Sequence, residues 1–328
     1  MNDTFYYVYC QGLLGVRTNV RDFKWVYGSV AHSVEASEYE KCIVKFDVTV
    51  KKEKNLNNQI DCNRKFQAFK WSKEDKNISY RRTFPFRLEV GYDIKLEGNT
   101  VYAEVGERYY KFVKNRVMNL HGMYYLLSDI ANVMLLNNGF LTLYASAVHS
   151  EETGKCVVNF APPNTGKTLT AMKLCETSDT TLVGEDVLIT DGKQVYSCPW
   201  TSSYRNSKKN ADSAGSLSRC SIPTDVKFAR ECPLTDMVVL SLGEEKIVEN
   251  KEFILKQISI LNGYLFNYYS SPIVKVLAYF DEEYNKPWNQ YAEALLERTV
   301  DNKNCYLIQT QSSEKFANII EKKIFGSK

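Results

Sequence analysis

The stretch Asn159–Leu174, NFAPPNTGKTLTAMKL, decides the fold of this chain. The segment before it, KCVVNFA (residues 155–161), is strongly apolar and predicts a buried strand, and the residues after Gly166 carry the apolar spacing of a helix. Between them, Ala161–Thr168 fits the pattern [AG]-x-x-x-x-G-K-[ST]. A strand, such a loop and a helix together direct backbone N–H groups and the positive end of the helix dipole at an anion. The stretch therefore predicts a phosphate-binding loop.

The residues of this loop have separate expected roles. Lys167 is placed to reach the β- and γ-phosphates of a nucleotide, and the Thr168 hydroxyl to hold magnesium. Pro162 and Pro163 carry no N–H group, which removes two donors but stiffens the loop. The phosphates are therefore expected to bind the remaining N–H groups, those of Asn164, Thr165, Gly166, Lys167 and Thr168.

An acidic pair follows soon after the loop, in the segment LVGEDVLITD. Asp186 lies 19 residues beyond Lys167 (186 − 167), and Glu185 precedes it. A strand, loop, helix and strand of this length return the chain to the carboxyl end of the sheet, beside the phosphate loop. One carboxylate there can bind magnesium while the other accepts a proton from an attacking hydroxyl.

The two parts of the chain differ in their sequence period. The first 110 residues or so read as short strands joined by polar turns, as in Ile43–Val50, where apolar and polar residues alternate. They predict an antiparallel sheet. From Arg116 onward, apolar residues recur at three- and four-residue spacing, and helices then alternate with apolar strands. We therefore expect a β-rich N-terminal domain over 1–115 and an α/β domain over 116–328.

The expected elements of the second domain can be stated as ranges. Strands are predicted over 140–148, 155–161, 180–190, 193–200, 236–242 and 304–311, and helices over 116–140, 166–177, 251–269, 288–300 and 313–325. A polar, basic loop over 201–225 interrupts them and carries Arg205, Lys208, Lys209 and Arg219. A loop of this length is often functional, although a solvated excursion is the alternative.

Composition excludes several classes of function. The net charge is only +3, which gives no reason to expect nucleic acid or a membrane as partner. Nine scattered cysteines and three histidines do not form a zinc pattern, and the cysteines are expected to be packing residues. We found no apolar run of about 18 residues and no signal peptide, so a cytoplasmic protein is expected.

From the strand before the loop to Pro199, the order of these motifs resembles the HPr kinase/phosphorylase family and its HPr-kinase-like relatives. The resemblance covers about residues 140–200 and is loose elsewhere. It implies a P-loop core of the phosphoenolpyruvate-carboxykinase-like fold and phosphorylation of Ser or Thr with ATP. It also implies that Lys167 binds the phosphates, that Thr168 and Asp186 hold Mg²⁺, and that Glu185 takes the place of the catalytic acid/base aspartate.

Three departures from the family qualify this resemblance. The acidic pair is Glu-Asp instead of Asp-Asp, and the family's histidine before the loop falls on Tyr144. His149 lies five residues further on and is a weaker candidate for that role. The C-terminal signature of true HPr kinases is not found, which speaks against HPr as the acceptor and puts phosphorylase activity in doubt.

Three functions therefore remain open. The first is an ATP- and Mg²⁺-dependent kinase of a peptide or small protein, similar to kinases that modify a lasso-peptide precursor. The second is a kinase of a small hydroxylated metabolite, and the third is a nucleotide-sensing regulatory module with little turnover, which the Tyr144 departure favours. Neither the acceptor nor the role of the N-terminal domain follows from the sequence, and a homo-oligomer stays open.

Overall fold

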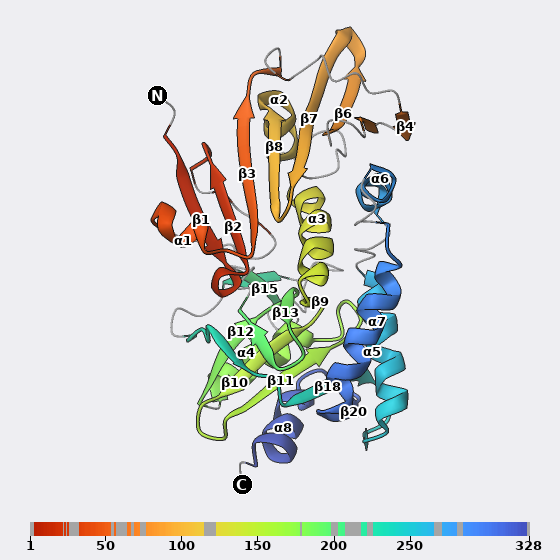
Figure 1. The fold of residues 1–328 in the computed structure, drawn as a ribbon. Helices are drawn as coiled ribbons and strands as arrows, with labels where there is room; N and C mark the ends of the chain where they lie inside the picture. Colours follow the sequence, from red (N-terminus) through yellow and green to blue (C-terminus); the bar gives the residue numbers. More distant parts are fainter. Residues whose placement is uncertain are drawn as a thin grey trace. The chain divides into compact units, whose positions relative to one another are not determined.

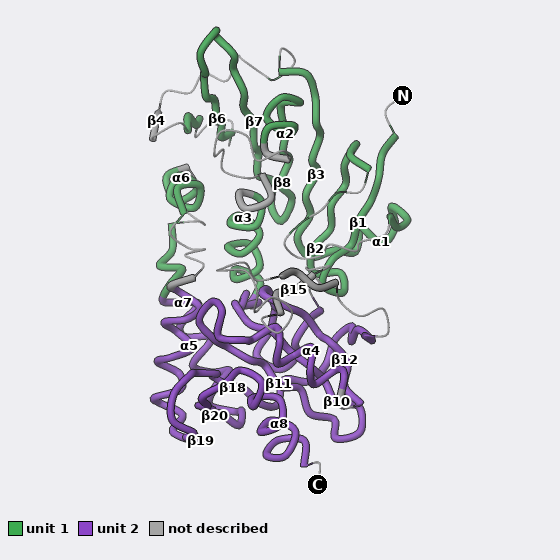
Figure 2. Tube along the Cα trace, turned by 180° about the vertical axis from the view of Figure 1, so that it is seen from behind, with its two compact units in different colours: residues 1–26, 31–138, 268–289 green, residues 27–30, 139–267, 290–328 purple. Residues whose placement is uncertain are grey.

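The computed structural model describes residues 3–21, 23, 25, 33–53, 56, 64–66, 69–72, 77–114, 123–177, 179–197, 203–206, 218–221, 226–265, 271–280 and 285–326. The chain is an α/β protein with several sheets (Figure 1). It divides into two compact units (Figure 2). Unit 1 comprises 1–26, 31–138 and 268–289, and unit 2 comprises 27–30, 139–267 and 290–328.

Unit 1 is built on one eight-stranded sheet in the order β1-β2-β3-β8-β7-β6-β5-β4. Its strands are β1 (Phe5–Tyr9), β2 (Leu14–Thr18), β3 (Val44–Lys51), β4 (Arg64–Phe66), β5 (Phe69–Ser72), β6 (Asn77–Phe84), β7 (Leu88–Glu97) and β8 (Thr100–Gly106). Its helices are α1 (Ala36–Glu40), α2 (Glu107–Lys114), α3 (Met123–Asn137) and α6 (Pro272–Phe280).

The prediction of an antiparallel sheet was wrong for the middle of this unit. The strand β3 pairs in parallel with both β2 and β8. A long connection that includes α1 separates β2 from β3, and four strands separate β3 from β8, so neither pair is a hairpin. At the end of this predicted strand region, residues 107–114 form the helix α2 instead.

Aromatic side chains fill the core of unit 1 near α3. Trp25 is almost fully buried, and its ring packs edge-on against Phe46 and Tyr9. The indole N–H of Trp25 donates to Ser128 Oγ at 2.8 Å, which satisfies its one polar group and ties it to α3. The helix α3 therefore belongs to unit 1, and the two units meet at 138/139.

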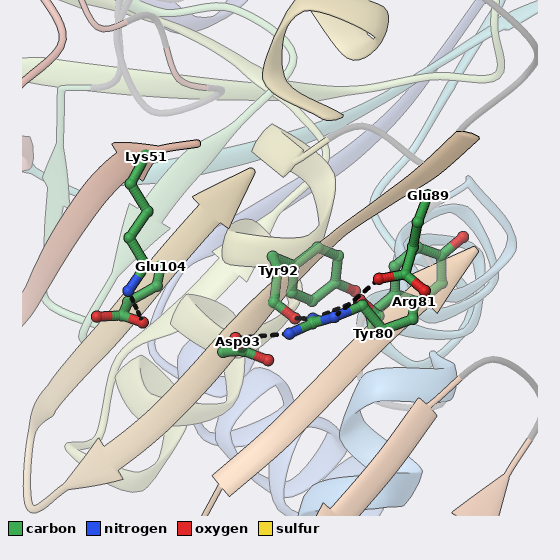
Figure 3. Close-up of polar contacts among 7 residues, drawn as sticks. All are labelled: Lys51, Tyr80, Arg81, Glu89, Tyr92, Asp93 and Glu104. Atoms are coloured by element: carbon green, nitrogen blue, oxygen red, sulfur yellow. Dashed lines mark hydrogen bonds and ion pairs between the residues drawn. The ribbon is translucent and has the colours of Figure 1, made fainter. Parts of the chain in front are cut away.

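Polar side chains tie neighbouring strands of the same sheet together (Figure 3). Arg81 lies between β6 and β7, where its guanidinium donates to the carbonyls of Tyr80 and Tyr92 and contacts Asp93 Oδ2 at 2.8 Å. Lys51 of β3 pairs with Glu104 of β8. A Cβ on Gly91 would lie 2.8 Å from Arg81 Cδ and 3.1 Å from Arg81 Nη1, so the Arg81 side chain fills the space that a side chain at position 91 would need.

Unit 2 contains two larger sheets and the helices that cover them. One sheet has the order β12-β10-β11-β18-β20-β19, and the other the order β17-β14-β13-β9. The strands are β9 (Leu141–Leu143), β10 (Ser146–Ser150), β11 (Lys155–Phe160), β12 (Thr180–Gly184), β13 (Leu188–Thr190), β14 (Gln194–Tyr196), β17 (Glu231–Pro233), β18 (Asp236–Leu242), β19 (Lys246–Val248) and β20 (Asn304–Thr310). The strands β15 (Ser203–Asn206) and β16 (Ser218–Ser221) form a separate hairpin.

The helices of unit 2 follow the predicted order. They are α4 (Lys167–Thr177), α5 (Lys251–Leu265), α7 (Trp288–Asp301), which begins in unit 1, and α8 (Lys315–Ile320), which continues as a π-helical turn (Glu321–Phe325). Buried residues of α4 and α8 share one apolar core with β11, β18 and β20, and this core fixes α4 directly behind the predicted loop. Among the described residues, no helix combines the length and the apolar composition needed to cross a membrane.

Gly91→Ala tests the packing under Arg81. A Cβ at this position would lie 2.2 Å from the backbone oxygen of Tyr80. We expect a loss of about 1–3 kcal/mol in the free energy of unfolding, because backbone must shift to admit the methyl group. Urea denaturation measures this change. Gly263→Ala, on α5 where nothing lies within 4 Å, is the matched control and should gain about 0.5–1 kcal/mol. Equal effects of the two substitutions would contradict the prediction.

Asp129 on α3 predicts a pH dependence of stability. Burial raises the pKa of its carboxyl group to about 7, and a hydrogen bond with Ser271 opposes the shift. The unfolded chain releases this proton near pH 4, so the folded state loses stability as the pH rises from about 4 to about 7. Asp129→Asn should therefore stabilise the protein by roughly 1–3 kcal/mol at pH 8 and change little at pH 4. Thermal unfolding at both pH values checks this, and an equal effect at both would contradict it.

Candidate active site

Two of the strands predicted in unit 2 are each interrupted, and the two interruptions lie next to each other. The predicted strand over 140–148 is divided at Tyr144 into β9 and β10, and the predicted strand over 180–190 is divided at Glu185 into β12 and β13. The strands β10 and β12 pair in one sheet, whereas β9 and β13 pair in the other. Both segments of the chain therefore pass from one sheet to the other side by side, at Tyr144 and at Glu185. The side chains at these two crossings face the same region.

The second crossing is a tight turn. Asp186 adopts a left-handed backbone conformation (φ 65°), and Val187 N–H donates to Glu185 O at 2.8 Å. Such a conformation is unfavourable for most residues but tolerated by aspartate. Within this turn, Glu185 is buried, whereas the side chain of Asp186 is about one-third exposed. Successive carboxylates thus occupy different environments.

The loop between β11 and α4 turns through two residues with positive φ angles. Asn164 and Gly166 have positive φ angles of 63° and 107°, and Thr165 N–H donates to Pro162 O at 3.3 Å. That hydrogen bond engages one of the five N–H groups expected to bind phosphate. The helix α4 begins at Lys167, and the first N–H groups of a helix have no partner within the helix.

Lys167 is the buried cation of the site. Its side chain is only 6% exposed, and its Nζ lies 2.9 Å from Asp186 Oδ1 and 3.3 Å from the centre of the Tyr144 ring. Burial lowers the pKa of the ammonium group, while the charges of Asp186 and Glu185 act in the opposite direction. One carboxylate and one aromatic face thus favour the charged form of the ammonium group, while burial opposes it.

Thr168 and Glu185 form the second contact between the loop and the acidic pair. The Thr168 hydroxyl donates to Glu185 Oε1 at 2.9 Å. The structure thus unites the residues that the sequence singled out, with Lys167 on Asp186 and Thr168 on Glu185. Thr168, which was expected to share magnesium with Asp186, contacts Glu185 in this arrangement.

Tyr144 belongs to the site, although it departs from the family pattern. Burial raises the pKa of its hydroxyl, and the neighbouring charges of Asp186 and Glu185 raise it further, so Tyr144 stays protonated. Asn262 of α5 stabilises the backbone at the first crossing. Its Oδ1 accepts a hydrogen bond from Tyr144 N–H at 2.7 Å, and its Nδ2 donates to Thr142 O at 3.2 Å. Sequence reasoning missed Asn262, whose only signal is a polar residue within the apolar pattern ISILNGYL.

The weaker candidates stand apart from this cluster or outside the described residues. His149 lies further along β10, opposite Cys156 and Thr181, and burial lowers its pKa. In the long basic loop, Arg205 and Arg219 are cross-strand partners in the β15–β16 hairpin. Lys208 and Lys209 lie outside the described residues, as do most residues of that loop.

The oxygen atoms of the site suit one small hard cation with additional ligands. In the part of the chain that the structure describes, no three His, Cys, Asp or Glu side chains are grouped to hold a metal ion. Mg²⁺ is commonly held by one or two protein oxygens together with phosphate oxygens and water. Thr168 and Asp186 could supply such oxygens, so the residues fit a cation that arrives with a nucleotide better than a resident metal.

No protein-family model and no curated protein match this sequence. Among solved structures, the chain is similar to the Hpr(Ser) kinase/phosphatase from Coxiella burnetii, with 12% identity and a TM-score of 0.25. The match covers 33% of this chain and 76% of that chain. A likeness this slight carries no argument about function.

A double-mutant cycle tests the contact between Tyr144 and Lys167. Tyr144→Leu removes the aromatic face, Lys167→Met removes the charge, and the double variant removes both. Because a desolvated ammonium group over a ring is worth about 2 kcal/mol at most, we expect a coupling free energy of about 1–2 kcal/mol from urea unfolding. Effects that add within about 0.5 kcal/mol would show that the two side chains do not interact.

Proposed function

We propose that this chain is an ATP- and Mg²⁺-dependent kinase that transfers the γ-phosphate to a Ser or Thr hydroxyl of a peptide or small protein. One observation carries the proposal. A loop with the form of a phosphate-binding loop presents Lys167 and Thr168 directly to two adjacent carboxylates, Asp186 at 2.9 Å and Glu185 at 2.9 Å. A buried cation, a hydroxyl and an acidic pair at a helix start are the groups that phosphoryl transfer requires.

Lys167 would bind the β- and γ-phosphates. Its ammonium group is already desolvated and held in place by Asp186 and the Tyr144 ring, so little further order is needed when an anion arrives. The N–H groups at the start of α4 would add hydrogen bonds to the same phosphates. Lys167 would then exchange the carboxylate of Asp186 for phosphate oxygens.

Asp186 and Thr168 would hold magnesium on the nucleotide side of the loop. Asp186 contacts Lys167 Nζ at 2.9 Å and is the more exposed of the two acids, and Thr168 follows Lys167 at the start of α4. Magnesium, when bound, neutralises negative charge on the phosphate oxygens. Asp186 becomes available for this role once Lys167 turns to the phosphates.

Glu185 would accept the proton of the attacking hydroxyl. The hydroxyl oxygen forms a bond to the γ-phosphorus, the bond between that phosphorus and the β,γ-bridging oxygen breaks, and ADP leaves with the bridging oxygen. The hydroxyl proton moves to Glu185, whose Oε1 is oriented by the Thr168 hydroxyl. The buried position of Glu185 keeps water away from this transfer.

The acceptor class rests on the sequence. The resemblance to HPr-kinase-like proteins over about 140–200 supports a hydroxyl on a peptide or small protein. The presence of a second folded unit, with its own eight-stranded sheet, agrees with a substrate larger than a metabolite.

The Glu185→Gln variant tests phosphate transfer separately from ATP binding. We expect phosphate transfer to fall at least 100-fold, since proton transfer by a positioned base contributes about 10²–10⁴-fold, while ATP affinity changes little. The assay measures transfer from labelled ATP to separate peptide and metabolite fractions, and calorimetry measures ATP binding. Glu152→Gln, an exposed residue at the opposite end of β11, is the matched control and should keep full activity.

Three results would contradict the proposal. Unchanged turnover in Glu185→Gln would exclude Glu185 as the base. Labelling of the metabolite fraction alone would assign a small-molecule kinase. Saturable ATP binding by the unmodified protein without product in either fraction would assign a nucleotide-sensing module.

A further inference from the structure

The turn after β20 lies against the phosphate loop. A Cβ built on Gly166 would lie 2.5 Å from Ser313 Cβ and 3.2 Å from Ser313 Oγ. The loop and this turn can approach so closely only because Gly166 has no side chain, and its φ of 107° also favours glycine. Residues nearly 150 positions apart in the sequence (313 − 166 = 147) thus form one surface.

Hydrogen bonds hold this turn in one shape. Thr310 is fully buried, and its Oγ1 donates to Ser312 O at 2.7 Å. Glu314 N–H donates to Ser312 Oγ at 3.3 Å, and Lys315 N–H donates to Ser312 O at 3.1 Å. The buried side chain of Phe316 then anchors α8 in the core that α8 shares with α4. Ser313 is therefore presented by a preformed turn, half-buried beside the loop.

The order of the strands places this turn and the acidic pair on opposite sides of the loop. Along the sheet, β12 leads to Glu185, β11 leads to the phosphate loop, and β20 leads to Ser313. The strands β11, β18 and β20 are parallel, and β12 runs in the same direction because both β11 and β12 are antiparallel to β10. All these carboxyl ends meet at one edge, and β12 and β20 are four strand spacings apart, about 19 Å.

The charges at this edge are unevenly distributed. Lys167, Glu185 and Asp186 gather on the β12 side of the loop, where they would meet the terminal phosphate. Ser313, which lies against the loop on the β20 side, belongs to the uncharged turn TQSS (Thr310–Ser313). The nearest lysine in the sequence, Lys315, is already paired with Glu245 at 3.0 Å. A nucleotide has its charged phosphates at one end and its uncharged nucleoside at the other. Its polarity therefore matches this arrangement in one direction only.

We propose that the turn Thr310–Ser313 is the nucleoside subsite and that the Ser313 hydroxyl hydrogen-bonds the sugar or base of a bound nucleoside triphosphate. This inference rests on the proposed function and adds the direction in which the nucleotide lies. The γ-phosphate points toward the β12 side, and the nucleoside crosses Gly166 toward the end of β20. Ser313 is a binding residue here and has no part in the proton transfer assigned to Glu185.

The experiment compares ATP with inorganic tripolyphosphate, which has the phosphates but no nucleoside. Calorimetry with Mg²⁺ measures the dissociation constant of each ligand for the unmodified chain, Ser313→Ala, Lys167→Met and Glu152→Ala. In Ser313→Ala we expect ATP to bind about 3–10-fold more weakly, the effect of one lost hydrogen bond, and tripolyphosphate to bind within twofold of the unmodified chain. Lys167→Met should weaken both ligands, and Glu152→Ala, at the far end of the sheet, should weaken neither.

Two results would overturn this inference. One is unchanged ATP affinity in Ser313→Ala, and the other is an equal loss for ATP and tripolyphosphate, which would mean that the substitution acts through the phosphate loop. Failure of the proposed function looks different, because the unmodified chain would then bind neither ligand, or would bind ATP without transferring phosphate to either fraction. The melting temperature of Ser313→Ala, expected to equal that of the unmodified chain, controls for misfolding.

Discussion

The site depends on the constraint that two neighbouring chain segments pass between the same two sheets at the same level. Hydrogen bonding between β10 and β12 and between β9 and β13 aligns the two crossings, because a register shift in either pair would separate them. A backbone that leaves a sheet exposes polar groups that need other partners. Asn262 supplies them for the first crossing, and the short Glu185–Val187 turn supplies one for the second. The candidate site thus lies where two strands of the sheets are interrupted.

The electrostatics of the site follow from burial. An ammonium group taken out of water loses hydration, which is why the pKa of Lys167 is lowered despite two nearby carboxylates. Asp186 at 2.9 Å and the aromatic face of Tyr144 offset that loss. In place of the histidine expected from the family pattern, tyrosine brings a ring that contacts the cation and a hydroxyl that does not titrate near neutral pH. Tyr144 therefore packs against the charged lysine without adding a base that titrates near neutral pH.

The residues of the candidate site could be predicted from the sequence more readily than their geometry. Local patterns predicted the loop, α4 and the acidic pair, because a phosphate loop needs particular residues at fixed spacing. They did not reveal that the apolar runs 140–148 and 180–190 each break in two, since both halves are buried and apolar and only the pairing partner changes. Ser313 and Asn262 could not be found either, because long-range strand order brings them to the site. The parallel pairs of β3 were missed for the same reason.

The contact between Lys167 and Asp186 also bears on how long a ligand stays. Any anion that binds Lys167 must replace the carboxylate of Asp186, which lies 2.9 Å from Lys167 Nζ. The free energy of breaking this ion pair is therefore subtracted from the binding free energy of the anion. When the ligand leaves, the ion pair can re-form at once without a large movement of backbone. An internal competitor of this kind lowers the affinity for an anion and shortens its residence time. In the proposed kinase it would favour rapid turnover over tight storage of the nucleotide.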